Sequence, residues 1–98
     1  MVKKKDGSRE YFDKTKMLAG IVKACQKRPV DCIAIANKVE RDILNSMKQE
    51  ISSEEIGERI MAELKNADAV AYVRFASIYR DFQDVETFMK ELRKFLKL

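Results

Sequence analysis

Apolar residues recur at helical spacing along most of this 98-residue chain. From residue 14 onward they stand three or four positions apart, a period that places them on one face of an α-helix. Five such stretches are each preceded by a residue suited to cap the first amides of a helix, namely Asp13, Asp31, Ser52, Asp68 and Asp84. Ser52 with Glu55 also fits a capping box. The pattern therefore predicts four to five helices with short connections.

Each predicted helix carries an apolar stripe. The stripes are Met17, Leu18, Ile21, Val22 and Cys25; Cys32, Ile35, Ala36, Val39, Ile43 and Met47; Ile56, Ile60, Leu64 and Ala67; Val70, Val73, Phe75, Ala76, Ser77, Ile78 and Tyr79; and Val85, Phe88, Met89, Leu92, Phe95 and Leu96. The fourth helix is apolar over the widest arc, so we expect it at the centre of the bundle. The fifth is the most sharply amphipathic. We favour its packing on its own core, with a subunit interface as the alternative.

The first twelve residues follow a different pattern. Asp6-Gly7 separates two short stretches, 2–5 and 8–12, and this dipeptide is typical of a two-residue type I′ turn with positive φ at both central positions. A β-hairpin is therefore predicted, and it must pack on the rest because an isolated hairpin is marginal in water. The expected fold is a single domain, residues 1–98, mainly α, with a small N-terminal β-hairpin capping a bundle of four to five helices.

Composition removes several classes of function. The chain has no His, which excludes Ser-His and Cys-His catalytic pairs and imidazole metal ligands. Its two cysteines, Cys25 and Cys32, match no ligand spacing, and we interpret them as buried free thiols of a reducing cytoplasm. The three glycines form neither of the glycine-rich phosphate-binding motifs. No apolar run could span a bilayer. We therefore expect a cytoplasmic protein that is not an enzyme and does not contact membranes.

The net charge of +4 arises largely at the N-terminus, because residues 1–16 carry six cations and three anions. We interpret this excess as a local anion site, with a solvated charge run as the alternative. Alternation along a strand would direct Lys4 to one face and Lys3 and Lys5 to the other. Lys16, one turn into the first helix, could converge with Lys4 on a phosphate.

Several stretches resemble a known family, the ATP-cone domain. The sequence VKKKDG at residues 2–7, EYFD at 10–13 and Lys16 are similar to the opening of this nucleotide-sensing module, which occurs on ribonucleotide reductases and on the bacterial repressor of their genes. Residues 24–30, 53–57 and 70–82 are closest to the cone of the repressor. The resemblance covers nearly the whole chain and implies a hairpin or small sheet over a helical bundle, with an adenine nucleotide between them.

The resemblance also implies a function and a set of site residues. ATP or dATP would bind as an effector without being hydrolysed and would modulate the assembly of a homo-oligomer, and Mg²⁺ can accompany the nucleotide. Carried over by position, the implied site residues are Lys4, Lys5 and Lys16 at the phosphates, Val2 and Phe12 beside the nucleoside, Glu10 at the base or sugar, and Ser53 and Tyr79 on the helical side.

One part of the repressor's pattern is missing. The repressor carries a zinc ribbon with four Cys ahead of its cone, and these 98 residues hold no such ribbon. We therefore expect no zinc here, and DNA contact only through a ribbon outside this sequence. An excised domain, a ribbon-less homologue and a stand-alone cone stay open. Two other functions also stay open: a nucleic-acid-binding module that uses the basic N-terminus, and a structural interaction domain that has lost nucleotide binding.

Overall fold

The computed structural model describes residues 1–80 and 84–96, without the side chains of residues 91 and 94–96. The elements are β1 (Val2–Lys3), β2 (Arg9–Glu10), α1 (Lys14–Ala24), α2 (Cys32–Asn45), β3 (Ile51–Ser52), α3 (Ser53–Ala67), α4 (Ala69–Tyr79) and α5 (Val85–Leu96). The predicted fold class is confirmed, because the described chain is mainly helical with a small sheet near its N-terminus. Among the described residues, no helix is both long and apolar enough to cross a membrane.

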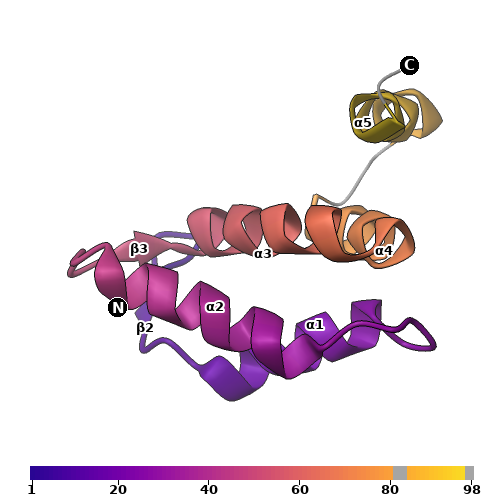
Figure 1. The fold of residues 1–98 in the computed structure, drawn as a ribbon. Coiled ribbons are helices and arrows are strands. Elements are labelled where there is room, and N and C mark those ends of the chain that lie inside the picture. Colours follow the sequence, from indigo (N-terminus) through magenta and orange to yellow (C-terminus); the bar gives the residue numbers. More distant parts are fainter. Residues whose placement is uncertain (81–83, 97–98) are drawn as a thin grey trace.

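Four of the helices form two layers, with α1 beside α2 and α3 beside α4 (Figure 1). Each of the four helices contacts two others: α1 packs on α2 and α4, and α3 packs on α2 and α4. The largest fully buried side chains, Ile21, Val39 and Leu64, come from three different helices and occupy the space between the layers. One core therefore holds all four helices together.

Helix α4 is not the centre of the bundle. It buries Ala71, Tyr72 and Ala76, but Val70 is 38% exposed and Ile78 is 64% exposed. Four helices around a shared core have no central member, so each one keeps an outer face in solvent. The prediction of a central fourth helix is wrong for this reason, although its wide apolar arc is real.

Helix α5 stands apart from the two layers (Figure 1). Val85 is 75% exposed and Met89 is 41% exposed, whereas Phe88 and Leu92 are half-buried. The favoured prediction that this stripe packs on its own core is therefore wrong for Val85 and Met89. Phe95 and Leu96, predicted on the same stripe, lie outside the described side chains. The chain therefore presents an amphipathic helix with apolar residues in solvent.

All five predicted N-caps are confirmed. In each case the side chain accepts a hydrogen bond from an amide in the first turn: Asp13 from Lys16, Asp31 from Ala34, Ser52 from Glu55, Asp68 from Ala71 and Asp84 from Thr87. These bonds satisfy amides that have no partner within the helix.

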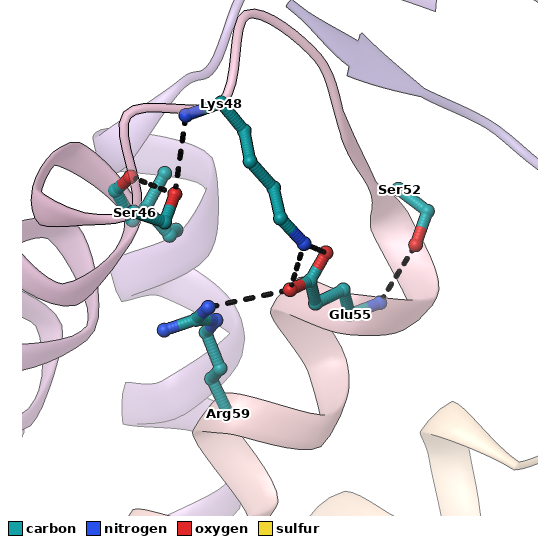
Figure 2. A network of polar contacts seen from close by, with 6 residues as sticks. Ser46, Lys48, Ser52, Glu55 and Arg59 are labelled. Atoms are coloured by element: carbon teal, nitrogen blue, oxygen red, sulfur yellow. Dashed lines mark hydrogen bonds and ion pairs between the residues drawn. The ribbon is translucent and has the colours of Figure 1, made fainter.

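The carboxylate of Glu55 holds a loop against α3 (Figure 2). The two carboxylate oxygens accept hydrogen bonds from Lys48 Nζ at 2.8 and 3.0 Å, and one of them also accepts from Arg59 Nη2 at 3.2 Å. The backbone amide of Glu55 donates to Ser52 Oγ at 3.0 Å. Because Lys48 precedes β3, this network fixes the chain just before it enters the sheet.

The sheet has three strands in the order β2-β1-β3. β1 runs antiparallel to β2 and parallel to β3, so Val2 pairs with Glu10 on one side and with Ile51 on the other. The predicted hairpin is confirmed, whereas the third strand begins in one of the short connections expected between helices and ends at the predicted cap Ser52. Two residues are too few for an alternating pattern to predict a strand. The added strand attaches the hairpin to the start of α3.

The hairpin turn differs from the predicted one. The Gly7 amide donates to the Lys4 carbonyl at 3.0 Å, and the Lys4 amide donates to the Ser8 carbonyl at 2.8 Å, which leaves a three-residue loop. Gly7 has φ of 88°, whereas Asp6 is not in the positive-φ region. This is the pattern of a turn followed by a left-handed glycine. The type I′ prediction is therefore wrong.

Candidate functional site

A cavity of about 610 Å³ lies between the hairpin and the helices α1, α3 and α4. Its lining includes all eight residues implied as site residues: Val2, Lys4, Lys5, Glu10, Phe12, Lys16, Ser53 and Tyr79. The hairpin and the first turn of α1 supply the first six, and the helical layer of α3 and α4 supplies the other two. Residues spread over most of the sequence are thus brought to one cavity, while their binding roles stay predictions.

The polar side of the cavity is organised around Glu10. One carboxylate oxygen, Oε2, lies 3.2 Å from Lys4 Nζ, and the other, Oε1, lies 3.5 Å from Lys16 Nζ. The hydrogen bond from Lys4, followed by the charge of Lys16, holds the pKa of Glu10 below its usual range. Lys5 adds a third cation to the lining. One carboxylate therefore holds the ammonium groups of Lys4 and Lys16 at the cavity, while their convergence on a phosphate stays a prediction.

Lys5 shows where the strand argument fails. Strict alternation places it on the face opposite Lys4, yet both lysines line the cavity. The reason is that β1 ends at Lys3, so residues 4 and 5 already belong to the turn and no longer alternate. The expectation from alternation is wrong for Lys5.

The other two carboxylates of the N-terminus serve the local backbone. Asp6 accepts from the Ser8 hydroxyl at 2.6 Å and from the Ser8 amide at 2.9 Å, and these bonds lower the pKa of Asp6. Asp13 accepts from the Lys16 amide at 3.1 Å. Both line the cavity, but each shapes an element that carries a lysine. Among the residues that the structure describes, no cluster of three or more His, Cys, Asp or Glu could hold a metal ion.

The opposite side of the cavity is apolar and aromatic. The rings of Phe75 and Tyr79 stack with centroids 5.9 Å apart and an interplanar angle of 20°. The Tyr79 hydroxyl donates to the Glu54 carbonyl at 2.7 Å, which ties the end of α4 to the start of α3. Burial raises the pKa of Tyr79, with the nearby Glu58 and Glu54 as further causes. The ring is therefore held in place and neutral.

Sequence reasoning missed part of the lining, and helical spacing could have found most of it. The missed residues outside the hairpin are Met17, Gly20, Ile56, Gly57, Ile60 and Phe75. Five of them stand three, four or seven positions from the predicted residues Lys16, Ser53 and Tyr79, on the same helical faces, and Met17 directly follows Lys16. Tyr11 carried no such signal. Tyr72, which shares a face with Tyr79 by spacing, is instead buried in the core.

This geometry defines a class of protein: a small helical domain with a cation-lined cavity under a three-stranded sheet. Residues 1–85 match the ATP cone domain family, and the chain belongs to that family.

Curated relatives named transcriptional repressor NrdR match nearly the full chain. The chain is 54% identical to the protein of Thermoanaerobacter sp. (strain X514), over 99% of the chain and 63% of the relative. It is also 54% identical to those of Caldicellulosiruptor bescii and Clostridium kluyveri, over 98% of the chain and 65% and 66% of the relatives. The chain therefore spans just under two thirds of the length of these relatives.

Proposed function

We propose that this chain is a non-enzymatic regulatory domain, of the kind found in repressors of ribonucleotide reductase genes, that binds ATP or dATP and changes its self-association. Membership of the ATP-cone family and the similarity to named repressors support the class. The observation that carries the proposal is the gathering of all eight implied residues around one cavity.

The polar side suits a phosphate chain. Lys4 and Lys16 both pair with Glu10 and are themselves 42% and 68% exposed, so solvent and ligand can reach them. A triphosphate carries more negative charge than one carboxylate and would compete for both ammonium groups. Lys5 lines the same cavity and adds a further contact. Glu10, once released, can accept a hydrogen bond from the base or sugar.

The apolar side suits an adenine ring. Val2 is 6% exposed and lines the cavity together with the half-buried Phe12. Phe75 and Tyr79 lie in the lining contributed by the helices, with Ser53 as a hydroxyl donor and acceptor. A cavity of about 610 Å³ lies in the range that small-molecule sites occupy, about 300–1,000 Å³.

We infer that the end of α4 links the nucleotide site to self-association. Tyr79 lines the cavity and is also the last residue of α4, six positions before α5 begins. The exposed Ile78 precedes that point and the exposed Val85 and Met89 follow it in the chain, so apolar surface lies on both sides of it in sequence. A nucleotide that shifts Tyr79 would therefore alter the helix end that leads to this surface. It shifts assembly only if it binds one assembly state more tightly than another.

Calorimetry with paired variants tests nucleotide binding. Lys4→Ala with Lys16→Ala should weaken the affinity for ATP by at least tenfold, because two charge-assisted contacts are worth more than about 1.4 kcal/mol together. Lys3→Ala with Lys23→Ala removes the same charge from exposed positions outside the lining and should leave the affinity within about twofold. Equal losses of ATP affinity in the two double variants would mean that the lysines attract ATP by net charge alone and do not form a specific site.

Light scattering after size exclusion tests the regulatory half. The protein should elute with different masses when run alone, with ATP and with dATP. Coincident profiles in a sample that binds nucleotide by calorimetry would reject control of self-association while leaving the binding site intact.

A further inference from the structure

A cysteine stands at each end of the connection between α1 and α2. Cys25 is the C-cap of α1 and is buried, and Cys32 is the first residue of α2 and is half-buried, so the interpretation of two buried thiols holds only for Cys25. Cys32 packs against the core cluster that contains Cys25, and after burial it is the next cause of the raised pKa of Cys25. Segment 26–31 thus forms a loop whose two ends each place a cysteine at the same core cluster.

Contacts to other helices hold that loop in shape. The guanidinium of Arg28 makes a bidentate pair with the carboxylate of Asp68, with N–O distances of 2.9 to 3.2 Å. Arg74 Nη1 donates to the Gln26 carbonyl at 2.7 Å. The loop also contains Lys27 at φ of 61°, in the left-handed region. The positions of the two cysteines at the ends of this loop are therefore held by bonds that do not involve sulfur.

We propose that Cys25 and Cys32 form a reversible dithiol–disulfide site that reacts with low-molecular-weight disulfides. Cys32 is the accessible partner, and its thiol donates only a weak hydrogen bond to the Val30 carbonyl at 3.7 Å. Cys25 is enclosed by the core. The two positions divide the chemistry between an attacking thiol, Cys32, and a resolving thiol, Cys25.

The exchange takes two steps. The Cys32 thiolate attacks one sulfur of the small disulfide, so that a Cys32 mixed disulfide forms and one small thiolate leaves. The Cys25 thiol then gives its proton to solvent and attacks Cys32 Sγ, which forms the Cys25–Cys32 bond and releases the second small thiolate. One disulfide bond replaces another, and two small thiols are produced. Burial, together with the facing Cys32, raises the pKa of Cys25 to about 12, so the second step is the slow one.

The new bond would join the end of α1 directly to the start of α2. Because the disulfide also closes this short loop in the unfolded chain, it removes unfolded conformations and raises the temperature of unfolding.

Mass spectrometry of the native protein incubated with oxidised glutathione tests the proposal. We expect a monomer lighter by two hydrogen atoms, a tryptic peptide pair linked through residues 25 and 32, and recovery of the starting mass with dithiothreitol.

Single variants separate the two roles. Cys25→Ser should accumulate the glutathione mixed disulfide on Cys32, and Cys32→Ser should react far more slowly than wild type. Cys25→Ala serves if the serine variant loses its helical circular dichroism. The ring-closed form should also be favoured roughly tenfold more in the native protein than in urea, because folding raises the effective concentration of one thiol at the other. A wild type that stops at the mixed disulfide, cross-links between chains, or closes no better when folded would overturn the proposal.

Discussion

The ring of Tyr79 lies directly over Gly57, and a Cβ at position 57 would overlap the ring atoms. The ring cannot turn aside freely, because its hydroxyl is bonded to the Glu54 carbonyl and its face stacks on Phe75. Gly57 is thus the position that lets α4 close against α3 at the cavity. The relationship joins a residue implied as part of the site to one that sequence reasoning passed over.

Gly57→Ala should therefore destabilise the protein and weaken ATP binding together. Overpacking of this kind costs about 1–3 kcal/mol, which outweighs the better helix propensity of alanine. The matched control is Gly20→Ala, since a Cβ at Gly20 meets no atom within 4 Å. Urea denaturation should show a loss for Gly57→Ala and a gain of about 0.5–1 kcal/mol for Gly20→Ala. Equal effects at the two glycines would contradict the close contact with Tyr79.

The core can be tested at Leu64, which is fully buried between the layers. Leu64→Ala should lower the free energy of unfolding by about 2–5 kcal/mol, from lost burial and the cavity left behind. Leu44→Ala makes the same chemical change on a side chain that is 69% exposed, and should change stability by less than about 0.5 kcal/mol. Chemical denaturation of both variants checks the difference, which must be large if the two-layer core is right.

The Arg28–Asp68 pair predicts a dependence of stability on pH. Hydrogen bonds from Arg28 and from the Ala71 amide lower the pKa of Asp68 from its ordinary value of 3.8. Because the folded pKa is the lower one, this stabilisation is fully present above the unfolded pKa and is lost as the pH falls through the folded pKa. Thermal unfolding of Asp68→Asn should give a lower Tm than wild type at neutral pH, and the gap should close below pH 3.8.

Asp31→Asn provides the comparison for that experiment. Asp31 also caps a helix, through the Ala34 amide at 3.0 Å, and asparagine is an equally good cap. Its Tm should follow that of wild type closely at neutral pH. A loss at Asp31 as large as that at Asp68 would assign the effect to capping rather than to the ion pair with Arg28.

The sequence predicted most of the fold because its strongest signals are local. A cap such as Asp13 or Asp68 acts on amides three residues away, so spacing along the chain suffices to find it. Strand β3 depends on a partner far away in the sequence, and no local signal fixes where α5 lies. Ile51 pairs with Val2, although two helices separate these residues in the sequence. A strand of two residues carries no pattern that predicts such a partner.

The candidate site divides in the same way. The resemblance to the ATP-cone family pointed to Lys4, Glu10 and Tyr79, which the fold brings to one cavity. Strand alternation alone misplaced Lys5, because it assumed a strand longer than the two residues of β1. Gly57 was missed because its importance lies in the absence of a side chain under the Tyr79 ring, and only the packed structure shows that contact.

The central claim is that adenine nucleotide binds in the cavity between the hairpin and the helices. An NMR titration of the ¹⁵N-labelled chain with ATP tests it most directly, since every amide reports separately. The account predicts saturable shifts concentrated at the lining, at Lys4, Phe12, Lys16, Ser53 and Tyr79, with little change at exposed residues of α2 such as Ile33 and Leu44. Saturable shifts centred on α2, or no shifts at millimolar ATP, would contradict it.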